Sequence, residues 1–525
     1  MTDQNEIELQ TALPNEKEGL KTEEQLTPLI QFAQITIKVQ DIVDKIPLGR
    51  FHYRFMFIVF LHYFSAAYVT YNLGYILMYP KYQCIFNDQK YFSECQREQI
   101  CSNQDGLINE WRVDDKNELS LNNWVTRLDL MCADSFYIGL YGSLDFFGQL
   151  FASVFLTPLA DKYGKRWFTI IGSSSQILTF IIILVFQNRV LYYFSILILG
   201  ITFINKNFVT YSHLMDFIGQ KGSFVTGWLF CLDSFNFIFS PLILYFITKN
   251  TQVFAWIGLV ITCTVVASLK FIYFPESLKF TLNQGNYEKA KADSKQIMSE
   301  NGDRLVDYLN LAQLIDKYET QQKKEQEKNK TNEDQVDEKP SIRKLIFTTR
   351  YTIRNLLLMI ICWISTSTSF FIFNFYIKYI QANIYVIGVA MGFSCFGYLY
   401  SDIVVQRLGF AKCLSISYAI ASILMGLIIF IDPNQISVYI YALMFFMLKS
   451  FVCMSYSGIF VSHVYLFDSR ILATSYGICG LFSRIAMLFI PMIVEIPNKK
   501  IPLVILLIMN MSAFGASFLL KKIDQ

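Results

Sequence analysis

Long apolar runs alternate with short polar segments along most of the chain. Each run is long enough to cross a hydrocarbon core about 30 Å thick as an α-helix. Six runs come first, near 55–78, 134–158, 167–186, 190–213, 224–247 and 252–274. After a long polar segment come six more, near 352–378, 384–404, 411–431, 436–465, 471–494 and 500–520. The pattern predicts an all-α polytopic membrane protein with 12 transmembrane helices in two six-helix halves.

Polar segments divide the chain into four predicted regions. Residues 1–54 form a polar N-terminal segment without the apolar core and cleavage site of a signal peptide. Residues 55–274 hold the first half, including a hydrophilic loop at 79–133. Residues 275–350 are polar and contain the charge-rich stretch KYETQQKKEQEKNKTNEDQVDEKP, which predicts a flexible or partly helical linker. Residues 351–525 hold the second half and a short tail.

Basic residues in the short loops orient the predicted helices. Seven lie in alternate loops on the side of the central linker: Lys162, Lys165, Arg166, Lys221, Arg407, Lys412 and Arg470. Five lie in the opposite loops: Arg189, Lys249, Lys378, Lys499 and Lys500. The positive-inside rule makes the richer side cytoplasmic, so we expect both termini inside and residues 79–133 outside.

Composition agrees with a membrane protein, because 53% of the residues are hydrophobic and only 17% are charged. Four of the 11 cysteines share the outer loop: Cys84, Cys95, Cys101 and Cys132. An even number in one loop predicts two disulfides in an oxidising compartment, with three pairings open and four free thiols as the alternative. This favours the plasma membrane or a membrane of the secretory pathway.

Other function classes find little support in the sequence. The chain has four histidines, no metal-ligand spacing, no nucleophile elbow and no Walker-type glycine-rich loop. Its net charge of +3 is not gathered in a basic patch with exposed aromatic residues. We therefore expect no enzymatic activity, no metal or cofactor, and neither ATP nor nucleic acid as a partner.

The stretch ADKYGKR follows the second run and sets four residues at a characteristic spacing: Asp161, Gly164, Lys165 and Arg166. A glycine permits a tight turn between two helices, and an aspartate can stabilise the positive end of a neighbouring helix. VQRLGFA lies at the corresponding place after the eighth run, with Gly409 offset by 245 residues from Gly164. Two halves related by such a parallel repeat indicate a transporter that binds substrate between them.

These residues carry a family resemblance. ADKYGKR resembles the loop between the second and third helices of the major facilitator superfamily. DIVDKIPLGRFHYRF, WVTRLDLMC and PESLKFTLNQGNYEKA occur in the order typical of its organic cation, organic anion and carnitine transporter family. The resemblance runs from about residue 40 onward and implies the major facilitator fold. It also implies a cytoplasmic gating motif made of Asp161, Gly164, Lys165, Arg166, Asp216 and Glu276.

The chain departs from the family pattern at the cytoplasmic side. Where the family has a Glu-Leu-Tyr/Phe-Pro sequence after the tenth helix, this chain has Tyr465, Leu466, Phe467 and Asp468. Gln406 replaces the acid of the second-half motif, and Pro158 stands near the leading glycine of the first. These departures concern the gating contacts more than the fold.

Five ionisable residues lie inside the predicted spans: Asp145, Lys206, Asp233, Lys449 and Arg484. Each costs about 2.5–3.5 kcal/mol on insertion scales, so each needs a partner or a water-filled cavity. Lys206 lies on a polar helix stripe, which predicts a wet cavity, and Arg484 continues a face of small residues. The three cations would give a cavity a positive field for a carboxylate or sulfonate. Alternatively, the two aspartates neutralise them in structural ion pairs.

Aromatic and amide side chains complete the expected substrate site. Phe370 and Phe371 lie where relatives carry a cavity-facing Tyr-Gln pair, Trp228 begins the fifth span and Asn72 lies on a polar face of the first. Aromatic walls with a few placed charges suit amphiphilic metabolites.

Three functions remain open from the sequence. The first is a monomeric carrier of organic anions or zwitterions that works by alternating access, and the second is an organic cation carrier that uses Asp145 and Asp233. The third is a non-transporting receptor or structural subunit built on a transporter fold.

Overall fold

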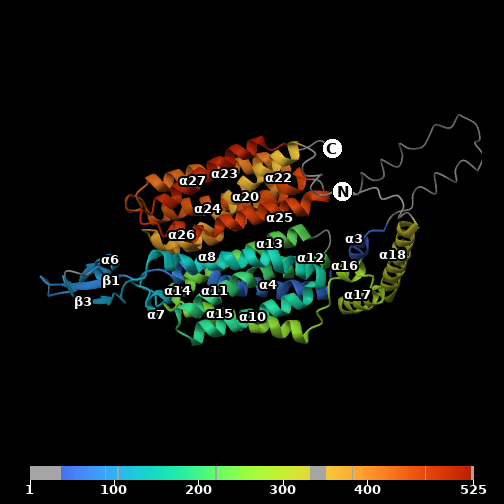
Figure 1. The fold of residues 1–525 in the computed structure, drawn as a ribbon, viewed down its shortest axis with the longest axis horizontal. Coiled ribbons are helices and arrows are strands. Elements are labelled where there is room, and N and C mark those ends of the chain that lie inside the picture. The colour runs from blue at the N-terminus through green and yellow to red at the C-terminus, as the bar shows by residue number, and fades with distance from the viewer. Residues whose placement is uncertain are drawn as a thin grey trace, which may run out of the picture.

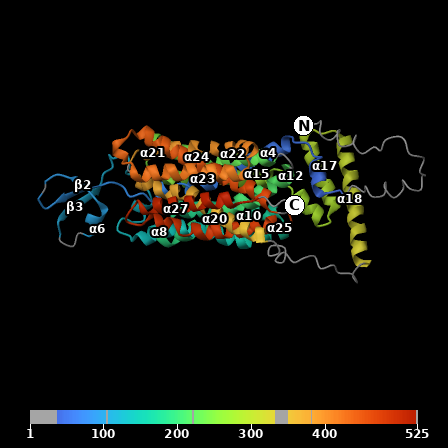
Figure 2. The same ribbon diagram turned by 90° about the horizontal axis from the view of Figure 1, so that it is seen from above.

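The computed structural model describes residues 37–88, 90–102, 106–218, 222–331, 350–380, 382–467 and 469–521. Twelve helical segments in these ranges are long and apolar enough to cross a membrane, which confirms the predicted six-plus-six arrangement. Figure 1 shows them as two bundles lying side by side, the first half in blue to green and the second in orange to red, and in Figure 2 the second half lies in front of the first. The chain is a multi-pass membrane protein.

The first bundle is built from segments that begin with α4 (Arg50–Thr70). The others, in chain order, are α5 (Leu73–Ile76); α8 (Ser135–Phe151), η2 (Ala152–Leu156) and α9 (Thr157–Tyr163); α10 (Lys165–Val185); α11 (Arg189–Ile204), η3 (Asn205–Thr210) and α12 (Tyr211–Ile218); α13 (Gly222–Ser234) and α14 (Asn236–Phe246); and α15 (Gln252–Phe271). The fifth span is broken at Phe235, ahead of Pro241, whose ring nitrogen cannot donate to the helix.

The second bundle repeats the arrangement. It contains α20 (Arg350–Tyr376) and η5 (Ile377–Tyr379); α21 (Ile384–Phe393) and α22 (Phe396–Leu408); α23 (Phe410–Phe430); η6 (Pro433–Gln435); α24 (Val438–Leu466); α25 (Ser469–Met487) and α26 (Ile490–Val494); and α27 (Ile501–Leu519). Gly164 and Gly409 precede α10 and α23 with closely similar backbone angles, φ +100°, ψ 146° and φ +85°, ψ 161°. The internal repeat predicted from these glycines is therefore present in the backbone.

The outer loop is a small folded unit, not an irregular loop, and it gives the all-α bundle one sheet. Strands β1 (Tyr82–Phe86), β2 (Ser93–Cys95) and β3 (Ile108–Val113) form an antiparallel sheet in the order β2-β1-β3. The helices α6 (Arg97–Cys101) and α7 (Trp124–Arg127) flank it. Disulfides join Cys84 to Cys95 and Cys101 to Cys132. We call the end of the bundle that carries this unit the disulfide end (Figure 1).

The opposite end carries the central linker, and we call it the linker end. Helices α16 (Leu278–Asn283), α17 (Tyr287–Asn301) and α18 (Leu305–Thr331) pack there with α3 (Val39–Val43), so this part of the linker is helical. The first span begins at Arg50, before the predicted residue 55, because Phe51 is buried and Arg54 pairs with Glu300 of α17. Residues 1–36 and 332–349, Lys221, Asp468 and residues 522–525 lie outside the described residues.

Hydrogen bonds between the two halves gather toward the disulfide end. There the Tyr75 hydroxyl donates to the Ile384 carbonyl at 3.2 Å, and the Tyr385 hydroxyl donates to the Glu118 carbonyl at 2.6 Å. Deeper in the bundle, the Ser143 hydroxyl donates to the Leu488 carbonyl at 2.7 Å. The halves are therefore closed against each other at this end.

Candidate functional site

Lys206 lies in the middle of the first half in a buried ion pair. It belongs to η3, a π-helical turn, and such widened turns are frequent at functional sites. Its Nζ donates to the Tyr63 carbonyl at 2.7 Å and lies 3.2 Å from Oδ1 of Asp233. The Tyr71 hydroxyl donates to Oδ2 of the same aspartate at 2.6 Å. The sequence predicted that Lys206 faces a wet cavity, but the side chain is fully buried and Asp233 neutralises it.

Arg484 and Asp145 are connected across the two halves through a glutamine. Nη1 of Arg484 on α25 donates to Oε1 of Gln149 at 3.2 Å, and Nε2 of Gln149 donates to Oδ2 of Asp145 at 2.9 Å. The guanidinium also lies 5.2 Å from the centre of the Phe208 ring in the first half. Arg484 thus contacts the opposite bundle without touching a carboxylate among the described residues.

The helix face that carries Arg484 is uncrowded. Gly480 and Gly477 lie four and seven residues before it on α25, which places all three on one helix face. A Cβ added to either glycine would meet no atom within 4 Å. The face that carries the arginine is therefore open.

Lys449 on α24 is a buried cation surrounded by rings. Its Nζ donates to the Phe370 carbonyl at 2.5 Å and lies 3.8 Å from the centre of the Phe370 ring. The rings of Phe237 and Phe373 are 5.4 and 5.8 Å away. In the part of the chain that the structure describes, no carboxylate lies within ion-pair distance of this ammonium.

The predicted aromatic wall is partly assembled. Phe370 and Phe371 are both buried, with ring centres 5.1 Å apart, and Phe371 contacts Phe146 of the first half at 5.3 Å. Asn72 is buried and donates to the Ser240 hydroxyl at 2.8 Å, so it ties the first span to the fifth. Trp228 is 41% exposed and lies outside this buried cluster.

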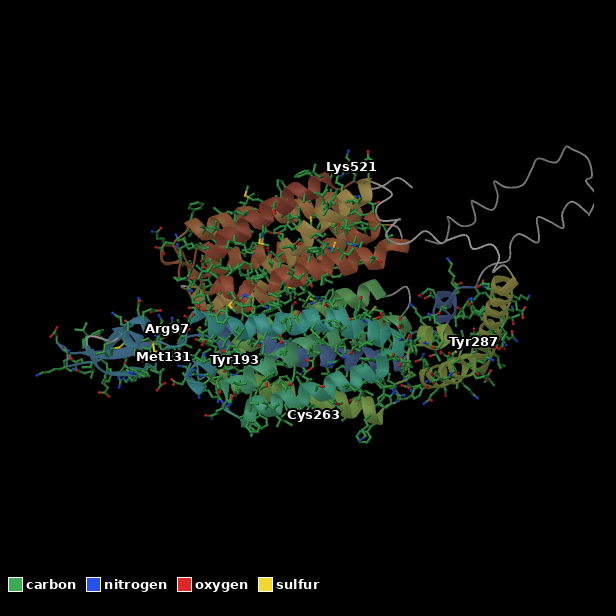
Figure 3. All side chains as sticks on the ribbon, in the orientation of Figure 1. Arg97, Met131, Tyr193, Cys263, Tyr287 and Lys521 are labelled. Atoms are coloured by element: carbon green, nitrogen blue, oxygen red, sulfur yellow. A yellow bond between two sulfur atoms is a disulfide. The ribbon has the colours of Figure 1, made fainter. Side chains whose placement is uncertain are left out.

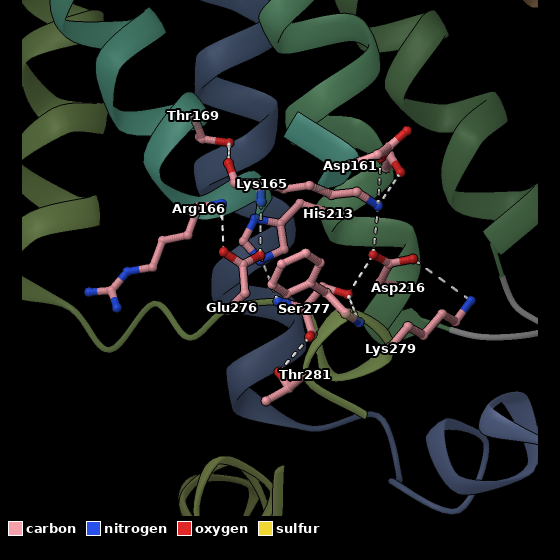
Figure 4. Close-up of polar contacts among 12 residues, drawn as sticks. Asp161, Lys165, Arg166, Thr169, His213, Asp216, Glu276, Ser277, Lys279 and Thr281 are labelled. Carbon is pink, nitrogen blue, oxygen red and sulfur yellow. Dashed lines mark hydrogen bonds and ion pairs between the residues drawn. The ribbon is translucent and has the colours of Figure 1, made fainter. Parts of the chain in front are cut away.

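A second group of charges lies at the linker end and holds the predicted gating motif (Figure 4). The Glu276 carboxylate accepts hydrogen bonds from the Lys165 amide at 3.0 Å and the Arg166 amide at 3.1 Å. These amides begin α10, so the glutamate caps the positive end of that helix. The Ser277 amide also donates to it at 3.0 Å. The conformation of Gly164 makes this possible, because a Cβ there would lie 2.5 Å from Oε2 of Glu276.

Asp216 joins the motif from the fourth span. Its Oδ2 lies 2.8 Å from Nζ of Lys165 and accepts from the Ser277 hydroxyl at 2.6 Å. Asp161 is more loosely held, with a side chain 64% exposed and 3.9 Å from the same lysine. All these residues belong to the first half or the start of the linker, so the cluster ties one half together.

Comparison with known proteins identifies the family of this chain. Residues 55–491 match the Major Facilitator Superfamily. The chain belongs to this superfamily. Superfamily and fold are those of a transporter, which implies a small-molecule substrate and a lipid bilayer as partners.

Curated relatives agree with the resemblance found in the sequence. This chain is 23% identical to mouse organic cation/carnitine transporter 2 over 216 residues, which are 38% of this chain and 35% of the relative. It is 22% identical to mouse solute carrier family 22 member 21 over 302 residues, 54% of this chain and 48% of the relative. The matched parts thus span about half or less of these relatives.

Solved structures show the same fold. The inward-open xylose transporter XylE from E. coli aligns with a TM-score of 0.60 at 10% identity, over 89% of this chain and 95% of that one. A partially occluded inward-open form of XylE aligns with a TM-score of 0.58, over 89% and 98%. At this identity the likeness concerns the fold alone.

The sequence analysis missed several residues that contact the buried charges of this chain. Gln149 lies four residues after Asp145 on α8, a spacing that places two side chains on one helix face and could have indicated the pair. Tyr71 and Tyr63 gave no such signal, because their partners Asp233 and Lys206 come from distant spans. The π-helical turn that presents Lys206 has no reliable sequence pattern.

Proposed function

We propose that this chain is a secondary carrier of small organic ions, with organic anions or zwitterions as its substrates. It works by alternating access, in which the two halves rock around a site between them. We further propose that the linker end is cytoplasmic and the disulfide end extracellular, that the protein resides in the plasma membrane, and that it works as a monomer.

The observation that carries the proposal is the charge balance inside the bundle. Lys206 and Asp233 neutralise each other, whereas Arg484 and Lys449 have no direct carboxylate partner among the described residues. Unpaired buried cations are costly, and an anionic ligand would compensate them. The guanidinium of Arg484 offers two parallel hydrogen bonds to a carboxylate, and its helix face is open at Gly480 and Gly477.

The arrangement of the halves supports alternating access. Their mutual hydrogen bonds gather toward the disulfide end, which is the pattern expected of a carrier closed to the outside. Opening outward would break these hydrogen bonds, each worth about 0.5–1.5 kcal/mol, and would separate apolar contacts between the halves such as that of Phe146 with Phe371.

Uptake into proteoliposomes tests the proposal. Saturable uptake is expected for at least one member of a panel containing benzoate, L-carnitine and a quaternary ammonium cation. Arg484→Ala should lower anion uptake at least tenfold, whereas Arg407→Ala, at an exposed arginine of the same half, should leave it unchanged. Absence of saturable uptake across the panel, or loss of cation uptake alone in Arg484→Ala, would refute the anion proposal.

One observation favours the organic cation alternative. Asp145 is buried, and its Oδ1 accepts no hydrogen bond from the described residues, so it retains capacity for a cationic group. Two of the relatives are named organic cation/carnitine transporters. Asp145→Asn should then abolish cation uptake and spare anion uptake, the reverse of the pattern expected for Arg484→Ala.

A further inference from the structure

A large cavity lies at the disulfide end, away from the charges in the middle of the bundle. Its volume is about 940 Å³, which is within the range of small-molecule sites. Its walls come from both halves: the folded outer unit contributes Tyr82 and Arg97, and the second half contributes Lys378, Tyr379 and Lys499. We call it the bridging cavity. Figure 3 labels Arg97 where this unit meets the bundle.

The less exposed charged groups of the bridging cavity are mainly cations. Lys378 is 3% exposed and pairs with Glu495 at 2.6 Å, so this carboxylate is already engaged. Nε of Arg97 lies 3.4 Å from the exposed carboxylate of Glu98. The Nζ of Lys499 lies 3.6 Å from the centre of the Tyr379 ring, and its hydrogen bonds go only to main-chain carbonyls at 3.4 and 3.5 Å. The Arg97 guanidinium lies 4.2 Å from the centre of the Tyr79 ring, with its Nη1 buried and without a hydrogen bond in the described structure.

The acids of this cavity are more exposed than its cations, although Glu98 remains within ion-pair distance of Arg97. Glu94, Glu98 and Glu118 line it, but all three are exposed, and the first two have side chains 73% and 68% exposed. Water therefore screens their charges more strongly than it screens those of the less exposed cations. The inner wall of the bridging cavity is positive, and its rim is acidic.

Tyr82 adds an unused hydrogen-bond donor. It is 3% exposed and lines the bridging cavity, yet its hydroxyl has no partner among the described residues. A buried hydroxyl without a partner costs about 1–3 kcal/mol, so a native structure normally satisfies it. An anion in the cavity would accept from it.

The surroundings of Lys499 show the same imbalance of charge. Burial lowers the pKa of its ammonium to about 8, and the positive charges of Lys378 and Arg97 oppose the stabilising charge of Glu495. Glu98 and the Tyr379 ring complete its surroundings. A bound anion would restore the missing negative charge.

We propose that the bridging cavity binds an organic sulfonate or carboxylate, and that the bound anion holds the two halves together at the disulfide end. The anion would contact Tyr82 and Arg97 of the first half and Lys499 of the second. Because outward opening separates these groups, the ligand favours the closed arrangement. The site is distinct from the one around Arg484 and does not depend on the proposed substrate.

Binding of radiolabelled naphthalene-2-sulfonate to the purified full chain in nanodiscs tests the proposal. The same measurement is made on Arg484→Ala, alone and combined with each cavity variant described below. This background excludes binding of the probe at Arg484. Saturable binding should persist in that background, and the neutral naphthalene-2-sulfonamide should compete at least tenfold more weakly. Loss of all saturable binding in Arg484→Ala would overturn the proposal.

Variants of the cavity wall locate the bound anion. Lys499→Gln should weaken binding at least tenfold and Lys499→Arg should largely restore it, whereas the neighbouring Lys500→Gln should stay within twofold of the parent. Tyr82→Phe keeps the ring and should weaken binding severalfold, so it serves if Lys499→Gln fails to fold. A change of less than twofold in both Lys499→Gln and Tyr82→Phe would contradict the site.

Hydrogen exchange tests the effect on the two halves. Saturating naphthalene-2-sulfonate should slow exchange of residues 73–78 and 378–385, which contain the contacts between the halves at the disulfide end. Unchanged exchange in both segments while the probe is bound would refute the stabilising role.

Discussion

Glu276→Gln isolates the electrostatic role of the cluster at the linker end. The native carboxylate uses both oxygens: Oε1 accepts from the Lys165 and Ser277 amides, and Oε2 accepts from the Arg166 amide. A glutamine of the same shape keeps one oxygen and replaces the other with an amide nitrogen, which cannot accept a hydrogen bond. The substitution therefore removes a negative charge and at least one hydrogen bond from the start of α10 without creating a cavity.

The magnitude follows from these losses. A hydrogen bond to a charged group contributes about 1.5–3 kcal/mol, and a negative charge at a helix N-terminus contributes about 0.3–1 kcal/mol. The expected local loss is thus about 2–4 kcal/mol. Because every 1.4 kcal/mol is a factor of ten, the first turn of α10 should open roughly 25- to 700-fold more often.

Hydrogen exchange followed by mass spectrometry measures that opening directly. Peptides that contain the Lys165 and Arg166 amides should exchange faster by about this factor in Glu276→Gln, while peptides from α27 should not change. Glu288→Gln is the matched control, since Glu288 is 85% exposed on α17. Exchange at α10 within threefold of the wild-type rate would refute the capping role of Glu276.

Three further changes test other parts of the structure. Gly164→Ala and Gly409→Ala both place a residue with a Cβ at a positive φ. Only the Cβ at position 164 would meet Glu276, at 2.5 Å, so Gly164→Ala should lower the thermal midpoint of unfolding more than Gly409→Ala does. Equal shifts of the midpoint would contradict this. Copper-phenanthroline oxidation should join Cys231 to Cys395, whose Sγ atoms are 3.2 Å apart across the halves. After proteolysis within residues 317–340, a non-reducing gel should show one band, and two bands in Cys231→Ser; fragments that separate in the wild type would contradict the contact. Naphthalene-2-sulfonate binding should weaken as the pH rises through about 8, where Lys499 loses its charge. Lys499→Arg should remove that dependence, and a flat profile in the wild type would argue against Lys499 as the contact.

Hydrophobic runs were sufficient to predict the twelve helices and their division into halves, because the bilayer fixes both the length and the apolarity of a spanning helix. The β-sheet of the outer unit was missed. Its strands are three to six residues long, and β3, INEWRV, exposes most of its side chains, so it lacks the alternation that marks a strand. The pairing of Cys84 with Cys95 depends on that sheet. In the register of β1 and β2, Cys95 lies opposite Tyr82, which is two residues before Cys84 on the same strand, so the sheet brings the two cysteines close together.

The site was predictable by residue type but not by partner. The cost of a charge in a membrane identified Lys206, Asp233, Asp145, Lys449 and Arg484 before any geometry was known. Which cation meets which acid depends on how distant spans pack, and no spacing within one helix contains that information. As a result, the wet cavity expected at Lys206 proved to be a closed ion pair with Asp233.

The position of the predicted gating motif bears on the proposed motion of the two halves. Lys165 is the centre of this cluster: its side chain contacts Asp161 and Asp216, and its amide donates to Glu276. The interactions of these residues stay within the first half and its linker. The equivalent turn at Gly409 has open space where Gly164 meets Glu276. The two halves thus share a backbone repeat, but among the described residues no acid lies against Gly409 as Glu276 does against Gly164. In the proposed rocking motion each bundle moves as a rigid body. We infer that the cluster stiffens the first half, because its contacts join the second, third, fourth and sixth spans. A substitution in the cluster should therefore slow turnover by loosening one half, while leaving the charges that would bind substrate near Arg484 in place.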